Sequence, residues 1–179
     1  MSNTKKKDSL KSIIVLLSIC LLVAVLLAAV NMLTKDTIKE ADEKKEADAL
    51  KSVIDGAEEF EELNPVGCDE SVVAVYKEKE GRGYAVLLSV KGYDSSNPMS
   101  VAVGFDNEGK ITKCHVISCS GETSGIGTKV SDDAFLSSFE GKNDMSSVDT
   151  ISGATISSSA FVEAVDSALK AVELVKEAE

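Results

Sequence analysis

Histidine, tryptophan and basic residues are scarce in this sequence of 179 residues. It has one histidine, no tryptophan, and 19 lysines and arginines against 30 acidic residues, which gives a net charge of −11. A single histidine excludes a His-rich zinc or redox centre, and no spacing around it supports a nucleophilic triad. Because binding to a phosphate backbone needs a positive surface, we expect no nucleic-acid partner.

Paired cysteines of the kind that bind metal are missing as well. Cys114 and Cys119 are five residues apart, and no second pair completes a four-ligand site, so we predict no metal. Together with Cys68 they make an odd number of cysteines in the part of the chain where disulfides would form. A bridge between Cys114 and Cys119 on one strand would need a bulge or a strand end between them, because such residues point to opposite faces.

Charges are absent from residues 13–33, which read IIVLLSICLLVAVLLAAVNML. As a helix these residues span about 31 Å, close to the hydrocarbon thickness of a bilayer. The alternative is a cleaved signal peptide, which has a shorter apolar core and ends at a small-residue cleavage site. This run is longer and lacks such an ending, so we predict a retained, single-pass transmembrane helix that contains Cys20.

The two sides of this helix differ in charge. Residues 1–35 carry five lysines and one aspartate, whereas residues 36–179 carry 14 basic and 29 acidic side chains. The positive-inside rule therefore predicts that residues 1–12 form a basic cytoplasmic tail and that the acidic part lies on the extracytoplasmic side of the cell membrane. Residues 34–56 are rich in helix formers and free of proline, and they are predicted to form a stalk helix capped at Gly56.

Residues 57–179 are predicted to form one α+β domain with an antiparallel sheet. Runs of β-branched and other apolar residues, separated by short polar turns, indicate its strands: 72–76, 84–90, 99–105 and 111–119. The segment Asp106-Asn107-Glu108-Gly109 is a strong signal for the turn of a hairpin between the last two strands.

Two helices are expected to follow and to pack on the sheet. The first is capped by Ser131 and reaches Phe139, with Gly141 at its end, and the second runs from about Ser157 to Ala178. Apolar residues of the second helix recur at steps of three and four, so one face is expected to be buried. These residues are Ala160, Phe161, Ala164, Val165, Ala168, Leu169, Val172 and Val175.

A loop of small residues precedes the last predicted helix, with the sequence DTISGATISS from Asp149 to Ser158. Gly153 and Ala154 allow a ligand to approach the backbone closely, and the N–H groups near Ile156 carry the positive end of the helix dipole. Such a place suits a phosphate, and four hydroxyl groups would add donors: Ser152, Thr155, Ser157 and Ser158. From these residues alone, a capping loop with surplus Ser and Thr is an equal alternative.

The motif Asp149-x-x-Ser152-Gly153-Ala154-Thr155 resembles the D-x-x-S-G-A-T signature of bacterial FMN-binding domains that carry flavin covalently. A second segment, SGETSGIG from Ser120 to Gly127, resembles the H-x-E-T-P-G-L-G segment of that family, with serine in place of its His and its Pro. Over nearly its whole length the chain is similar to the G subunits of Rnf-type ion-translocating electron-transport complexes. The homologous C subunits of sodium-translocating NADH:quinone reductases are the next nearest.

The resemblance implies a covalent FMN site. The Thr155 hydroxyl would be joined to the FMN phosphate by a flavin transferase, which would recognise the motif through Asp149. The residues implied at the phosphate are Ser152, Gly153, Ala154, Ile156 and Ser157. Those implied around the flavin are Glu122, Thr123, Gly125 and Gly127, and Lys129 would pair with the phosphate or the ring carbonyls.

The resemblance also implies an electron carrier, which is an enzyme only as the electron-transfer subunit of a membrane translocase. Its partners would be the other subunits of the complex, the flavin transferase and the membrane. Electrons would pass between reduced ferredoxin and NAD⁺ through the assembled complex, coupled to the movement of Na⁺ or H⁺.

Two alternatives stay open. A flavoprotein of the same family could serve another respiratory or extracellular electron-transfer chain. A pilin-like surface protein also has an apolar helix, a stalk and a sheet. It would need a Gly-Phe processing site before the apolar run and a Glu near its start, and this sequence has neither.

Overall fold

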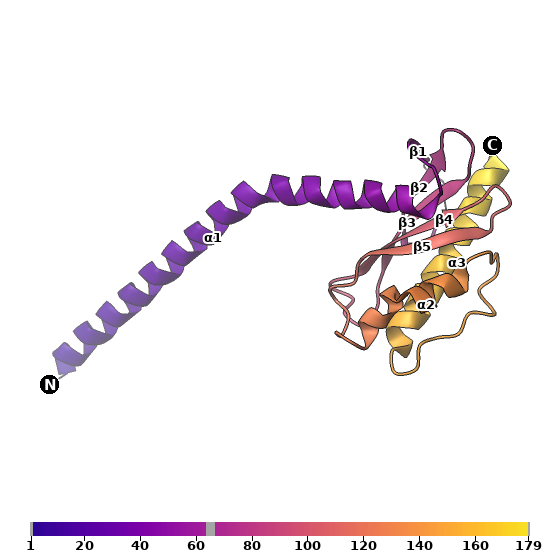
Figure 1. Cartoon of the computed structure of the whole chain (residues 1–179). Coiled ribbons are helices and arrows are strands. Elements are labelled where there is room, and N and C mark those ends of the chain that lie inside the picture. Colours follow the sequence, from indigo (N-terminus) through magenta and orange to yellow (C-terminus); the bar gives the residue numbers. More distant parts are fainter. Residues whose placement is uncertain (1, 64–66, 179) are drawn as a thin grey trace. The chain divides into compact units, whose positions relative to one another are not determined.

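The computed structural model describes residues 2–63 and 67–178. It divides into two compact units, Met1–Lys44 and Lys45–Glu179. The first consists of helix α1 residues alone, and the second holds the last turns of that helix, one sheet and the C-terminal helices (Figure 1). The second unit is the predicted α+β fold.

The predicted membrane and stalk helices form one continuous helix, α1 (Ser2–Val53). No glycine or proline occurs between residues 13 and 55, so nothing in the sequence breaks the helix at the expected boundary. The side chains of residues 13–33 are exposed, and among the described residues α1 is the one helix long and apolar enough to cross a membrane. Gly56, the predicted cap, adopts a φ of 73° in the turn that follows.

Five antiparallel strands form a sheet in which each strand pairs with the next one along the chain. They are β1 (Phe60–Leu63), β2 (Val72–Glu78), β3 (Tyr84–Val90), β4 (Met99–Phe105) and β5 (Ile111–Ser118). The last four confirm the predicted strands. The sequence does not predict β1, because this short Phe-Glu-Glu-Leu segment carries two charges and no β-branched residue. At the predicted hairpin turn, Gly109 adopts a φ of 86° and donates its N–H to the Asp106 oxygen at 3.1 Å.

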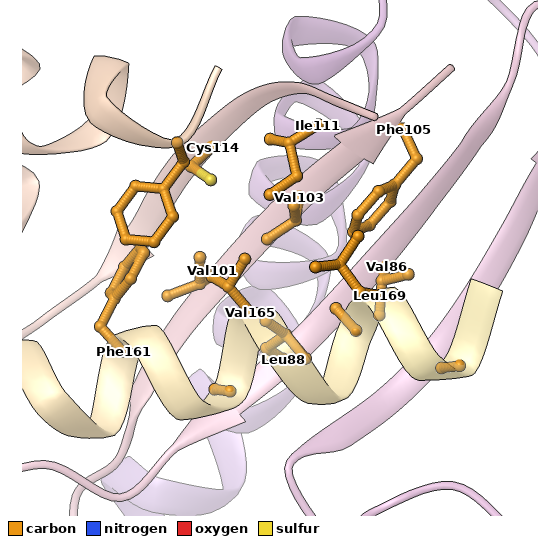
Figure 2. Packing of buried hydrophobic residues seen from close by; sticks show 14 of the residues in the cluster. Val86, Leu88, Val101, Val103, Phe105, Ile111, Cys114, Phe161, Val165 and Leu169 are labelled. Carbon is orange, nitrogen blue, oxygen red and sulfur yellow. The ribbon is translucent and has the colours of Figure 1, made fainter. Parts of the chain in front are cut away.

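Both faces of the sheet are covered, which explains why β3 is apolar at every position except Ser89. Helix α3 (Thr155–Ala178) covers one face, and Figure 2 shows Phe161, Val165 and Leu169 of this helix turned toward the strands. The last turns of α1 cover the other face, where alanines on β3 and β4 allow close packing. The apolar stripe predicted for the last helix is thus confirmed as its buried face, with Ala160 half-buried at its start.

Three short helical pieces take the place of the helix predicted from Ser131 to Phe139, and the first of them already ends at Ser131. They are η1 (Gly127–Ser131) and η2 (Ser137–Phe139), both 3₁₀ helices, and one α-helical turn, α2 (Asp133–Leu136). The predicted cap is wrong, because the Ser131 hydroxyl donates to the Thr128 backbone oxygen at 2.7 Å and Asp132 precedes α2.

Aromatic packing holds these short pieces against α3. The ring centroids of Phe135 and Phe139 both lie 5.4 Å from that of Phe161, and 5.1 Å from each other. Such a cluster stabilises turns too short to be stable helices on their own. It also fixes the first half of α3, and with it the loop that carries the sequence motif.

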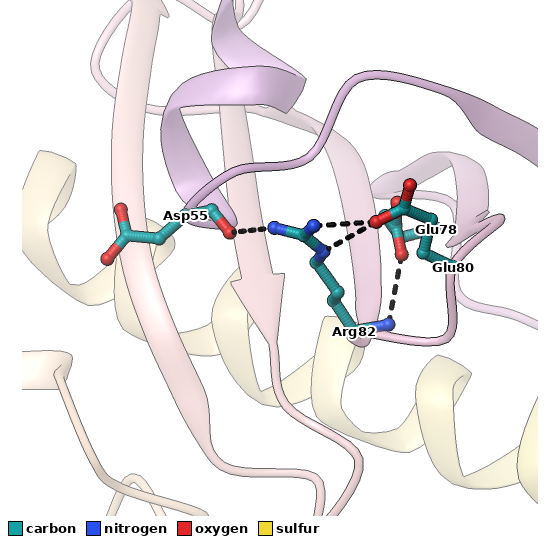
Figure 3. Close-up of polar contacts among 4 residues, drawn as sticks. All are labelled: Asp55, Glu78, Glu80 and Arg82. Carbon is teal, nitrogen blue, oxygen red and sulfur yellow. Dashed lines mark hydrogen bonds and ion pairs between the residues drawn. The ribbon is translucent and has the colours of Figure 1, made fainter.

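The turn between β2 and β3 fastens the end of α1 to the sheet. Arg82 donates from Nη1 to the Asp55 backbone oxygen at 3.3 Å and pairs through Nη2 with Glu80 at 2.6 Å (Figure 3). The buried carboxylate of Glu78 accepts the Arg82 N–H at 3.0 Å. This cluster lies beside the start of β3. The motif loop lies near residues that follow the end of β3, so the cluster supports the fold and is not part of the motif site.

The cysteines are free. Cys114 is buried on β5 against α3, and Cys119 follows the end of that strand. Burial raises the pKa of the Cys114 thiol, and the nearby Glu140 carboxylate adds to this. Burial also raises the pKa of Cys68, which is partly exposed.

Cys114 should therefore be alkylated more slowly than Cys119. Because the thiolate is the reactive form, we expect Cys114 to react at least roughly tenfold more slowly than Cys119 in the folded protein, and at the same rate in urea. Peptide mass spectrometry after timed iodoacetamide treatment measures both rates. Equal rates in the folded state would show that this part of β5 is open to solvent.

Candidate functional site

A cavity of about 410 Å³ lies at the N-terminal end of α3. This volume falls within the range of about 300–1,000 Å³ that small-molecule sites occupy. Three segments far apart in the sequence form it: Tyr93 after β3, the loop after β5, and the motif loop with the first turn of α3. The described lining residues are Tyr93, Thr123, Ile126, Gly127, Gly153, Ala154, Thr155, Ile156 and Ser157.

The cavity brings together seven of the residues that the resemblance implies, and it leaves five outside its lining. Those inside are Thr123, Gly127, Gly153, Ala154, Thr155, Ile156 and Ser157. Those outside are Glu122, Gly125, Lys129, Asp149 and Ser152. No charged side chain is among the described lining residues, whereas a cavity of about 280 Å³ beside β2 and α3 is lined by Asp69, Glu70, Lys91 and Glu163 among others.

The N-terminus of α3 lacks a side-chain cap. The Ser158 N–H donates to the Ala154 oxygen at 2.9 Å, so Ala154 occupies the N-cap position and Thr155 is the first helical residue. An N-cap side chain normally accepts the N–H groups of the second and third helical residues, here Ile156 and Ser157, and alanine has no acceptor to offer. Replacing a polar N-cap by alanine costs about 0.5–2 kcal/mol, and an anionic ligand would recover that loss.

The loop before the helix is held by its backbone and by one serine. Gly153 adopts a φ of 84°, a conformation that glycine tolerates, and an added Cβ would meet no atom within 4 Å. The buried Ser158 hydroxyl accepts the Ile151 N–H at 3.0 Å and donates to the Ala154 oxygen at 2.9 Å. The prediction that Ser158 adds a phosphate donor is therefore wrong, because its hydroxyl is buried and bonded within the protein. The same holds for the hydroxyl of Ser157, which is buried and donates to Glu122 Oε2. The motif residues Asp149, Ser152 and Thr155 are exposed.

Glu122 lies behind the cavity wall rather than among the lining residues. Its side chain is 7% exposed, its Oε1 accepts the Tyr93 N–H at 3.0 Å, and its Oε2 accepts the Ser157 hydroxyl. Gly127, which lines the cavity, gives this carboxylate its space, since an added Cβ would lie 2.6 Å from Glu122 Oε2 and 2.9 Å from Ser157 Oγ. Gly125 shapes the same loop with a φ of 73° and donates its N–H to Thr128 Oγ1 at 2.9 Å.

Replacing Gly127 with alanine should thus destabilise the domain. We expect a loss of about 1–3 kcal/mol in the free energy of unfolding, because the methyl group overpacks a buried hydrogen-bonded pair. Urea titration of the full chain in detergent measures this. Ser124→Ala, at an exposed position in the same loop, is the matched control and should change stability by less than about 0.5 kcal/mol. Equal midpoints for the two variants would contradict the packing described here.

Two lining residues, Tyr93 and Ile126, are not among the predicted site residues, although Ile126 lies within the SGETSGIG segment. With Ile156 they form an apolar rim, and the exposed fractions of the three residues are 66%, 49% and 61% in that order. Large apolar side chains this exposed on one cavity indicate a surface that a ligand or partner covers. The available signal was that Tyr93 stands alone in a polar segment, GYDSSN, where no core position is expected.

Two family models match the chain. Residues 1–53 match the RnfG N-terminal region, and residues 92–170 match the FMN-binding domain. The chain belongs to the RnfG-type family of FMN-binding subunits. It is accordingly an FMN-binding electron-carrier subunit of a multi-subunit Rnf-type complex, and its candidate membrane span agrees with a membrane-anchored RnfG subunit. No match was found among the curated proteins.

The FMN-binding match starts at Gly92 and ends at Lys170, so it covers every described lining residue of the cavity. The residues there fit the group. An uncapped helix N-terminus suits its phosphate, and an apolar rim suits its ring.

Proposed function

We infer that FMN is attached covalently to Thr155 and that the domain carries electrons within the Rnf-type complex through this tethered flavin. The observation that carries the proposal is the position of Thr155 at the cavity. Thr155 is the first residue of α3, directly after the alanine N-cap, and it is exposed and lines the cavity. A hydroxyl at this position is open to a modifying enzyme. The unpaired N–H groups beside it suit a phosphate ester.

The charges of the cavity favour an ester over a free phosphate. No lysine or arginine is among the described lining residues, so the helix N-terminus, equivalent to roughly half a positive charge, is the main electrostatic support. A free phosphate monoester carries about two negative charges, whereas the diester formed at Thr155 carries one. This partial charge offsets the single charge of a diester better than the double charge of a free phosphate, and the covalent bond prevents dissociation.

Attachment is the task of a flavin transferase, with Asp149 and Ser152 as part of the sequence it recognises. Both side chains are exposed on the loop before Thr155, where another protein can reach them. In the reaction the Thr155 oxygen bonds to the flavin phosphorus of a flavin dinucleotide. The pyrophosphate bond of that donor breaks, and the hydroxyl proton leaves with the released nucleotide.

The apolar rim is the surface against which the flavin ring is held. Tyr93, Ile126 and Ile156 would exclude water from the ring and orient it, and the neutral lining would keep fixed charge away from it. When bound, the flavin supplies one- and two-electron redox chemistry, which the protein itself lacks. The chain contributes the tether, the orientation and the helix dipole. It has no turnover of its own.

The membrane arrangement extends this proposal. The basic residues before the apolar run support an orientation with residues 1–12 in the cytoplasm and the FMN domain outside. From the family resemblance, the complex moves electrons between ferredoxin and NAD⁺ and couples this to Na⁺ or H⁺ movement. A cysteine-accessibility assay at position 36 with a membrane-impermeant reagent tests the orientation, and labelling in intact cells is the expected result.

Fluorescence on a denaturing gel tests the covalent link. The full chain produced together with a flavin transferase should give a fluorescent band after boiling in detergent, and the chain produced without it should give none. A non-covalent cofactor would be lost from both samples. A fluorescent band in neither sample, with the transferase active on a known substrate, would overturn the covalent assignment.

A further inference from the structure

Glu122 connects the segments that surround the cavity. Its carboxylate accepts a backbone N–H from Tyr93, after β3, and a hydroxyl from Ser157, in the first turn of α3. Its own N–H donates to the Cys119 oxygen at 3.0 Å, which ties it to the end of β5. Two walls of the cavity are therefore bonded to one side chain that lies outside the lining.

Two glycines make room for this connection. A Cβ at Gly92 would lie 2.0 Å from Glu122 Oε1, and a Cβ at Gly127 would lie 2.6 Å from Oε2. A buried carboxylate is costly unless it is hydrogen-bonded, and here one donor comes from each wall. Both of its oxygens act as acceptors. Moving either wall away would leave a buried carboxyl oxygen without its donor.

We propose that Glu122 is a positioning residue of the FMN site, which fixes the separation of the walls at Tyr93 and Ser157 and acts on the cofactor through them. The inference rests on the proposed function, since it concerns how that cavity holds the flavin. It differs from the contact implied by the family resemblance, in which Glu122 itself touches the flavin. The difference is measurable, because Ser157→Ala should add no effect to Glu122→Ala if the Ser157 wall is positioned through Glu122.

The first test measures how firmly the flavin is held. Glu122→Ala, Glu122→Gln, Ser157→Ala and the double alanine variant are produced as full chains with the flavin transferase, and the fluorescence anisotropy of the attached flavin is recorded. We expect a loss of anisotropy in both alanine variants, and no loss in the double variant beyond that of Glu122→Ala alone. Glu122→Gln keeps an acceptor for Tyr93 and a partner for Ser157, so it should stay close to the unchanged protein.

Glu78→Ala is the matched control. Glu78 is likewise a buried carboxylate that accepts a backbone N–H, but it ends β2 and does not line the cavity, so its loss should lower stability and leave the anisotropy unchanged. Additive losses in the double variant would show that Glu122 acts by its own contact with the flavin. Unchanged anisotropy in Glu122→Ala, or a loss in Glu122→Gln as large as in Glu122→Ala, would equally overturn the proposal.

The second test needs no flavin. The chain has three tyrosines, so selective ¹⁵N-tyrosine labelling gives three amide signals, with Tyr76 and Tyr84 as internal controls within strands. In protein made without the transferase, Glu122→Ala should speed exchange of the Tyr93 amide by roughly tenfold, with little change in Ser157→Ala. Unchanged Tyr93 exchange would overturn the proposal.

The two tests separate failure of this inference from failure of the proposed function. If the unchanged protein carries no covalent flavin, the covalent assignment fails, and the Tyr93 amide still reports on the Glu122 connection. If Glu122→Ala does not fold, exchange at Tyr76 and Tyr84 rises as well. The proposal is then tested by the flavin anisotropy of two other variants, which should fall in Ser157→Ala and stay unchanged in Glu122→Gln.

Discussion

Replacing Thr155 with alanine should abolish the fluorescent band of the full chain produced with a flavin transferase. The change removes the oxygen that forms the ester and leaves the helix start intact, because alanine is the best helix former and Ala154 remains the N-cap. The expected effect is complete loss of label with unchanged yield of folded protein. Gel fluorescence normalised to total protein measures it.

Thr150→Ala is the matched control for this change. Thr150 is an exposed threonine of the same motif loop, five residues before Thr155, and it does not line the cavity. Its replacement should leave the band in place. A band that persists in Thr155→Ala would refute the assigned linkage, and loss of the band in both variants would mean that the loop rather than the Thr155 hydroxyl decides labelling.

Replacing Phe161 with alanine should have the largest effect on stability. Phe161 is fully buried on α3, and its ring lies within 5.4 Å of two other phenylalanine rings. Removing it creates a cavity, and Phe→Ala changes in cores cost about 3–5 kcal/mol. Domains are stable by only about 5–15 kcal/mol, so the loss is a large share of the total. Urea titration in detergent, followed by tyrosine fluorescence, measures the change.

The control for Phe161 lies on the same helix. Leu174 is 38% exposed, and Leu174→Ala should cost about 0.5 kcal/mol or less. Since α1 keeps its helical structure in detergent, far-ultraviolet circular dichroism alone would underestimate the unfolding of the domain. Equal urea midpoints for Phe161→Ala and Leu174→Ala would contradict the claim that the aromatic cluster around Phe161 stabilises the domain and the motif loop.

The strands of the central sheet and the helix α3 follow from local sequence pattern. β3 and β4 are apolar runs bounded by glycine and polar turns, and α3 has apolar residues at helical spacing over 24 residues. β1 could not be predicted from local pattern, because the Phe-Glu-Glu-Leu segment becomes a strand only by pairing with β2. The broken helix around α2 does not follow either, since contacts with Phe161 rather than caps determine where its turns begin.

Some residues of the candidate site could likewise be predicted from local sequence pattern, and others could not. The motif loop and its place before α3 could be predicted, because small residues followed by a helical pattern identify a helix N-terminus. Tyr93 was not predicted, since it is a single loop residue with no periodic pattern around it, and Ile126 was not singled out within the SGETSGIG segment. Glu122 was expected near the flavin, but its connection to Tyr93 depends on a fold that brings residues 29 positions apart into hydrogen-bond contact.

Intact-mass spectrometry of the full chain purified from its native membranes is the most direct test of a flavin ester at Thr155. The predicted result is a mass increased by one FMN less one water, with the whole increase on the proteolytic peptide that contains Thr155. An unmodified chain, or an increase on a peptide without Thr155, would contradict it.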